Sequence, residues 1–233
     1  MGDSMRGLER WGRVLLLTAL FLSANAVTVS AQPTVKAKRP ADFVPAGYKI
    51  LQEAKGDLNK DGLEDCVLLI VGKRDESRRG IVIVFNRGEY YENMLENRNI
   101  FSYEKEDFIF FFAPSAEIAI KKGVLNIKTG FRHGGGGIIY VHNYKFRYQN
   151  SDFELIGYDF LHIDPADGDM TQSINFLSKK MHTKTAKEDA DGFYSKVIDE
   201  AWKNITIKEP IKLRKIVSLD EWKFNIYDYI TEN

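Results

Sequence analysis

The stretch that most constrains the fold of this chain is an acidic loop at residues 56–65, because it runs directly into an apolar segment at residues 66–71. Within the loop, oxygen-bearing side chains alternate around a glycine: Asp57, Asn59, Asp61, Gly62 and Asp65. The apolar segment reads Cys-Val-Leu-Leu-Ile-Val and ends at a glycine. A short, β-branched apolar run of this kind predicts a buried strand, so the loop is expected to lead into a sheet.

Oxygen ligands at alternate positions before a glycine match the first half of an EF-hand loop, where a calcium ion takes roughly six to eight oxygens. Residue 63 stands at the seventh position, which contributes a backbone carbonyl. The sequence therefore predicts a structural Ca2+ bound by five residues: Asp57, Asn59, Asp61, Leu63 and Asp65. The alternative interpretation is a tight turn that is rich in Asx residues and glycine for purely local reasons.

The twelfth position of the loop is Leu68 and not the bidentate Glu of an EF-hand, so a second helix is not expected. The pattern D-x-N-x-D-G-x-x-D followed by a strand resembles the calcium element of FG-GAP and VCBS repeats, as in integrin-type propellers. That resemblance covers the loop alone and implies that Asp65 is a ligand. With the aromatic pattern of residues 144–158, the chain is also similar to uncharacterised exported bacterial β-proteins that carry a single such loop. This likeness implies a β fold and export from the cell, and it implies no particular activity.

The first 31 residues have the pattern of a secretory signal peptide. Arginines at positions 6, 10 and 13 precede an uncharged run at residues 14–22, and small residues follow. We expect residues 1–31 to be the signal peptide, residues 32–40 a flexible leader and residues 41–233 a single β-rich domain. No later segment reaches the roughly 20 apolar residues of a membrane span, so the expected location is secreted or periplasmic.

The rest of the sequence favours a mainly β fold. Short apolar or alternating runs separated by turn residues occur at 81–85, 108–112, 117–120, 124–128, 138–148 and 153–160. Apolar residues near helical spacing also predict short peripheral helices at about 193–202 and 218–229. The prediction is an antiparallel sandwich or strongly bent sheet with one or two such helices. A complete propeller is not expected, because the acidic loop occurs once.

No catalytic residues are predicted, because the histidines lack metal-pair spacing and no serine lies in a Gly-x-Ser-x-Gly motif. The chain has 33 basic and 33 acidic residues, so no net charge favours nucleic acid. Beside the four glycines at 134–137, a ligand such as a sugar or peptide could be held by Phe131, Arg132, His133 and Tyr140. A freely bending hairpin tip is the alternative.

These observations predict an exported, non-catalytic binding or interaction protein of the cell envelope, with a glycan or another exported protein as its partner. Two alternatives stay open. The first is a glycan-active hydrolase that uses carboxylates from separate loops. The second is an inhibitor or chaperone of another exported protein.

Overall fold

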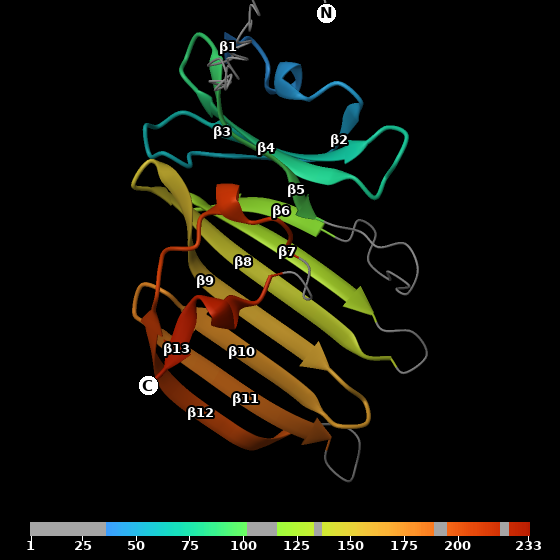
Figure 1. Ribbon diagram of the computed structural model, residues 1–233, viewed down its shortest axis with the longest axis vertical. Helices are drawn as coiled ribbons and strands as arrows, with labels where there is room; N and C mark the ends of the chain where they lie inside the picture. Colours follow the sequence, from blue (N-terminus) through green and yellow to red (C-terminus); the bar gives the residue numbers. More distant parts are fainter. Residues whose placement is uncertain (1–35, 102–115, 133–136, 189–194, 220–223) are drawn as a thin grey trace, which may run out of the picture. The chain divides into compact units, whose positions relative to one another are not determined.

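The computed structural model describes residues 36–101, 116–132, 137–188, 195–219 and 224–233, all of which lie in one compact unit, residues 34–233. Thirteen strands in this part of the chain form two antiparallel sheets (Figure 1). The prediction of a mainly β fold that is not a closed propeller is confirmed. The predicted strand at 108–112 lies outside the described residues.

The smaller sheet has five strands in the order β1-β5-β4-β3-β2. Their bounds are Lys36–Ala37 for β1, Tyr48–Gly56 for β2, Asp65–Gly72 for β3, Arg79–Asn86 for β4 and Tyr91–Phe101 for β5. Strands β3 and β4 are buried along nearly their whole length. One face contributes to a cluster that includes Phe43 of the short 3-10 helix η1 (Pro40–Phe43), and the other face joins the main core. Burial on both faces explains why these two strands are continuously apolar.

The larger sheet has eight strands in the order β13-β12-β11-β10-β9-β8-β7-β6. Their bounds are Ala116–Lys121 for β6, Val124–Arg132 for β7, Ile139–Gln149 for β8, Asp152–Ile163 for β9, Asp169–Asn175 for β10, Lys180–Glu188 for β11, Ser195–Ile207 for β12 and Ile230–Glu232 for β13. Strands β8 and β9 form the predicted aromatic hairpin. Its two-residue turn, Asn150 and Ser151, has positive φ at both positions, as in a type I′ turn.

A single hydrophobic core joins the two sheets. It combines Val67, Ile83 and Phe85 of the smaller sheet with Phe146 and Phe153 of the larger one, and all five are at most 1% exposed. The ring of Phe85 lies 6.1 Å from that of Phe153. Burying apolar area across this contact is the main source of stability expected for such a fold.

A C-terminal segment, of which the structure describes residues 208–219 and 224–229, closes this core. In Figure 1 it runs in front of β8, β9 and β10, and it includes the short 3-10 helices η2 (Leu213–Lys215) and η3 (Ile226–Asp228). Leu213 and Leu219 are at most 1% exposed. The side-chain amide of Asn97 in β5 donates to the carbonyls of Leu213, at 3.1 Å, and Ile216, at 2.8 Å. These bonds tie the segment to the smaller sheet.

The helix predicted near residues 193–202 is wrong, because Ser195–Ile207 form strand β12. Pairing with β11 along nine residues outweighs the helical spacing of the apolar residues. In the predicted helix at 218–229, the described residues 224–229 hold only the short helix η3. Among the described residues, no helix is long and apolar enough to cross a membrane.

Candidate functional site

The acidic loop connects β2 to β3, as predicted. Its residue Leu58 is 1% exposed and packs in the main core, so the loop is fixed at its start by apolar burial. Lys60 and Gly62 have positive φ angles of 65° and 88°. The glycine therefore stands at the sharp turn that the sequence pattern requires.

The carboxylate of Asp57 is enclosed by the backbone of the loop. Its Oδ1 accepts the N–H groups of Lys60, at 2.6 Å, and Asp61, at 3.1 Å. Its Oδ2 accepts the N–H of Gly62 at 3.0 Å. Residues 60–62 therefore wrap around the side chain at the first position of the loop.

The side chains of Asn59 and Asp61 lie against each other. The amide nitrogen Nδ2 of Asn59 donates to Oδ2 of Asp61 at 2.7 Å, and Oδ1 of Asn59 accepts the Asp61 N–H at 2.9 Å. Oδ1 of Asp61 in turn accepts the N–H of Leu63 at 2.9 Å. The first, third and fifth positions are thus brought together by short Asx turns. The side chains of all three residues can bind a metal through an oxygen atom. Oxygen ligands suit calcium better than a soft metal such as zinc.

Asp65 differs from the other acidic residues of the loop because it is fully buried. Its Oδ2 accepts the N–H groups of Leu58, at 2.8 Å, and Asn59, at 3.3 Å, and its Oδ1 accepts the N–H of Asn86 at 3.0 Å. Burial raises the pKa of Asp65, and these three backbone donors oppose that rise. Both oxygens of Asp65, like both oxygens of Asp57, therefore accept backbone N–H groups within the protein. The geometry gives Asp65 the role of fastening the loop to the end of β4, whereas its predicted role as a calcium ligand stays a prediction.

Sequence reasoning missed the second segment that meets the loop. Asn86 bonds to Asp65 as described, and Nη1 of Arg87 lies 3.8 Å from Oδ2 of Asp61. These residues lie more than twenty positions along the chain from the loop, and no local pattern connects them to it. They become neighbours only because β3 and β4 pair as a hairpin.

The loop also meets the larger sheet. Gly56 at the end of β2 is so close to Ile120 of β6 that a Cβ placed on the glycine would lie 2.6 Å from Cγ2 of the isoleucine. At Gly123, in the turn between β6 and β7, a Cβ would lie 3.2 Å from the carbonyl oxygen of Asp57. The acidic loop therefore lies at the junction of the two sheets, where its order affects both.

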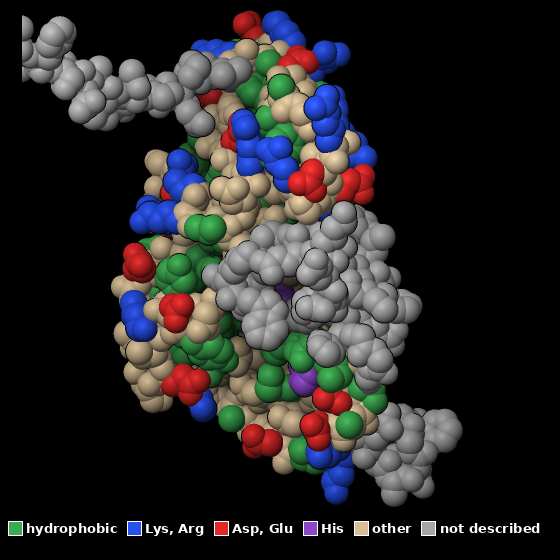
Figure 2. Space-filling view, turned by 45° about the vertical axis from the view of Figure 1, so that its right-hand side comes forward, with side chains coloured by type: hydrophobic (Ala, Val, Ile, Leu, Met, Phe, Trp, Pro, Cys, Tyr) green, Lys and Arg blue, Asp and Glu red, His purple; other side chains and the backbone are tan. Residues whose placement is uncertain are grey.

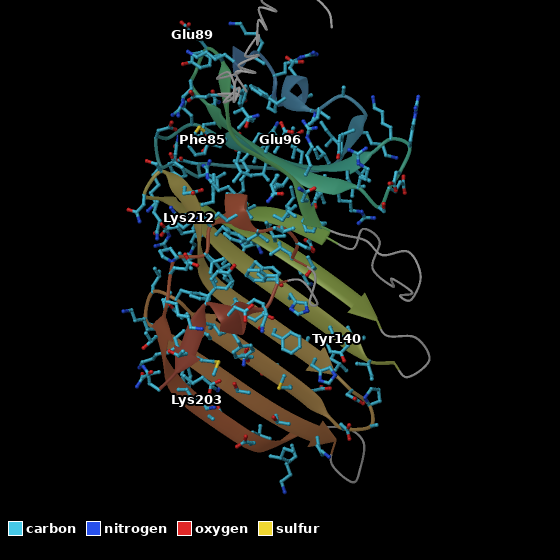
Figure 3. The ribbon with its side chains drawn as sticks, in the orientation of Figure 1. Phe85, Glu89, Glu96, Tyr140, Lys203 and Lys212 are labelled. Atoms are coloured by element: carbon cyan, nitrogen blue, oxygen red, sulfur yellow. The ribbon has the colours of Figure 1, made fainter. Side chains whose placement is uncertain are left out.

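The second predicted site is described only in part. Phe131 and Arg132 belong to β7, with backbones opposite Tyr140 and Ile139 of β8, and His133 lies outside the described residues. Figure 3 shows Tyr140 on the larger sheet and Phe85 on the smaller one. The ring of Tyr140 stacks on His162, with centroids 4.7 Å apart. Its predicted role in ligand binding stays a prediction.

Two other chemically reactive groups are buried close to these regions, His142 near Tyr140 and Cys66 next to Asp65. Burial lowers the pKa of His142 to about 4, so its imidazole is neutral at pH 7. Burial also raises the pKa of Cys66 to about 12, which leaves the thiol protonated. In the described part of the chain, no three His, Cys, Asp or Glu side chains converge as a metal site. The predicted calcium residues include three carboxylates, those of Asp57, Asp61 and Asp65, and they do not form such a group in this structure.

The surface around these regions is mixed in charge. Lysine and arginine side chains are interspersed with acidic ones over the smaller sheet, at the top of Figure 2. One example is Arg87, which pairs with Glu92 at 2.9 Å.

Comparison of the chain with protein-family models, with curated proteins and with solved structures finds no match.

Proposed function

We propose that this protein is an exported, non-catalytic binding module of the cell envelope whose acidic loop takes a structural calcium ion. The observation that supports the ion is the convergence of Asp57, Asn59 and Asp61 within one turn of backbone. The proposed location rests on the signal-peptide pattern of residues 1–31.

The residues that would hold the ion are the five predicted from the sequence: Asp57, Asn59, Asp61 and Asp65 through side-chain oxygens, and Leu63 through its carbonyl. Bound calcium supplies positive charge that offsets the repulsion between the carboxylates of Asp57 and Asp61. Asp65 contributes by holding the start of the loop against β4 through its three backbone hydrogen bonds. Because the loop lies at the junction of the sheets, ordering it is expected to stabilise the whole described unit.

The test is thermal unfolding of the purified protein in EGTA and across a calcium titration. A ligand that binds only the native state stabilises it by about 2.7 kcal/mol at a concentration one hundred times its Kd. For a chain of this size, that corresponds to a rise in Tm of about 5 to 10 °C. Magnesium at the same concentration is expected to have a smaller effect, because it demands a tighter octahedral site.

The matched variants are Asp57→Asn/Asp61→Asn in the loop and Asp164→Asn elsewhere. Asparagine keeps a carbonyl oxygen that can accept the loop N–H groups, so the double variant removes charge with little change in shape. Asp164 also accepts backbone N–H groups, from Ala166 and Asp167, in an exposed acidic turn. The calcium response is expected to disappear in the double variant and to persist in Asp164→Asn. A Tm that calcium leaves unchanged would reject the ion.

A further inference from the structure

A straight row of side chains crosses the outer face of the larger sheet. Direct backbone partners place Asn143 of β8 opposite Asp159 of β9, Asp159 opposite Ser173 of β10, Ser173 opposite His182 of β11, and His182 opposite Trp202 of β12. Directly paired residues in antiparallel strands share one face of the sheet. Neighbouring strands are about 4.8 Å apart, so the row extends about 19 Å from β8 to β12.

The next row along the sheet points into the core, which confirms that the two faces differ. Tyr144, Tyr158, Ile174 and Met181 are also direct partners, and each is at most 7% exposed. By contrast, Ser173 is exposed and Asn143, Asp159 and His182 are half-buried. Because side chains alternate along a strand, the row from Asn143 to Trp202 faces solvent.

Polar groups at one end of the row form a connected network. Oδ1 of Asp159 accepts the hydroxyl of Ser173 at 2.8 Å. Its Oδ2 accepts the side-chain amide of Asn143 at 3.3 Å and the ammonium of Lys145 at 2.5 Å. Partial burial acts to raise the pKa of Asp159, but these donors together lower it. The carboxylate is therefore ionised, paired and held in one orientation.

Aromatic groups occupy the other end. The indole of Trp202 is 68% exposed, which is unusual for so large an apolar side chain. The ring of His182 stacks beside it, with centroids 4.3 Å apart and planes within 22° of parallel. Nε2 of His182 lies 2.7 Å from Oε1 of Glu200, which fixes the imidazole. The stacking leaves a broad aromatic surface open to solvent.

Between the two ends lies an open hollow of about 290 Å3, lined by residues of β8, β9, β10 and β11. Val141 and Leu161 form an apolar edge of this hollow, while Asn143, Asp159 and Ser173 supply polar groups. A hollow with one apolar side, one polar side and an aromatic surface at its end suits a ligand that has both an apolar surface and polar groups.

We propose that this row binds an uncharged saccharide chain, which lies across the strands with a sugar ring stacked on Trp202. A sugar ring presents C–H groups on its flat faces and hydroxyls around its rim. The C–H face matches the indole, and the hydroxyls match the amide, carboxylate and hydroxyl groups of the polar end. The proposal names the ligand class of the binding function proposed above and rests on that function.

Charge favours a neutral ligand over an ionic one. The only carboxylate that lines the hollow within the described residues, Asp159, is paired with Lys145. Neither a phosphate nor a metal cation therefore meets an uncompensated opposite charge there. Specificity must come from hydrogen bonds and stacking, which are the interactions that a neutral sugar can supply.

The test is isothermal titration calorimetry of the purified protein with cellohexaose, maltohexaose and chitohexaose, each in calcium and in EGTA. At least one of these probes is expected to bind. Trp202→Ala is expected to lower the affinity at least tenfold and Ser173→Ala severalfold. Leu177→Ala is the control, because Leu177 is also an exposed apolar residue, at 54%, but lies outside the row.

The outcomes separate this site from the calcium loop. Absence of binding by all three hexasaccharides to folded protein would overturn the saccharide site, as would equal affinities for Trp202→Ala and the wild type. A Tm that responds to calcium without any saccharide binding would reject this site alone. Saccharide binding together with a Tm that calcium does not change would reject only the calcium site and would support the saccharide site.

Discussion

The buried histidine of β8 makes this protein sensitive to mild acid. His142 is 4% exposed, and its Nδ1 lies 2.8 Å from the hydroxyl of Tyr158. Burial lowers the pKa of His142 to about 4, whereas an unfolded histidine titrates near 6.5. The imidazole therefore stays neutral in the folded protein at a pH where the unfolded chain already takes up a proton.

The size of the effect follows from proton linkage. Above about pH 6.5 both states are neutral at this position, and the native state carries no penalty. As the pH falls from 6.5 toward 4, only the unfolded chain is protonated, and the free energy of unfolding declines. The loss reaches about 2 kcal/mol at pH 5 and about 3 kcal/mol at pH 4, because one pKa unit corresponds to about 1.4 kcal/mol. This is a large share of the 5 to 15 kcal/mol that is typical of a domain.

The measurement is urea unfolding at pH 7.5, 6 and 5 for the wild type, His142→Phe and Tyr158→Phe. His142→Phe removes the titrating group, so its free energy of unfolding is expected to fall by about 2 kcal/mol less than that of the wild type between pH 7.5 and 5. Tyr158→Phe keeps the buried imidazole and is expected to keep the pH dependence, even if its stability is lower at every pH.

Parallel pH profiles for the wild type and His142→Phe would refute this reasoning. An NMR titration offers a direct check, because the imidazole signals of His142 should not shift between pH 7.5 and 5. A midpoint near 6.5 for those signals in the folded protein would show that the ring is solvated.

Two further substitutions test the junctions of the fold. Gly56→Ala is expected to lower the free energy of unfolding by about 1 to 3 kcal/mol, because the added Cβ overlaps Ile120. In a double-mutant cycle, Ile120→Ala in the same chain should recover part of this loss. Losses that simply add would contradict the overlap. Arg214→Met is expected to cost about 1 to 2 kcal/mol in urea unfolding, because it removes a 2.8 Å partner from Asp152, which is only 5% exposed. Lys203→Met, at an exposed ion pair, should cost clearly less than Arg214→Met, and equal losses would argue against the burial of the Asp152 charge as the cause.

The sheet elements could be predicted where the sequence pattern and the local environment agree. The β8–β9 hairpin shows this, because His142, Tyr144 and Phe146 alternate with polar residues and all three are buried. The apolar run of β3 was also predictable as a buried strand. The sequence did not predict which elements cover the two faces of β3, because η1 and the larger sheet lie at other positions in the chain.

The failures have a common physical cause. Strand β12 has apolar residues near helical spacing, and pairing with β11 overrides that local pattern. At the acidic loop, the spacing of Asp57, Asn59 and Asp61 was visible in the sequence, and their clustering agrees with it. The three backbone donors around Asp65 were not visible, because one of them comes from β4. Long-range partners of this kind carry no local signal.

The way the C-terminal segment closes the core has a consequence for the order of folding. Within 211–230, the residues that the structure describes supply seven buried apolar side chains to a core whose other members come from both sheets. The Leu219 N–H bonds to the carbonyl of Ile100, and the Leu155 N–H bonds to that of Ile211, so these contacts join residues far apart in the chain. A chain emerging from the ribosome therefore exposes an incomplete core until residues 211–230 have been made. Long-range closure of this kind delays completion of the core, and an unfolded chain is the state in which a polypeptide can be threaded through a narrow membrane channel.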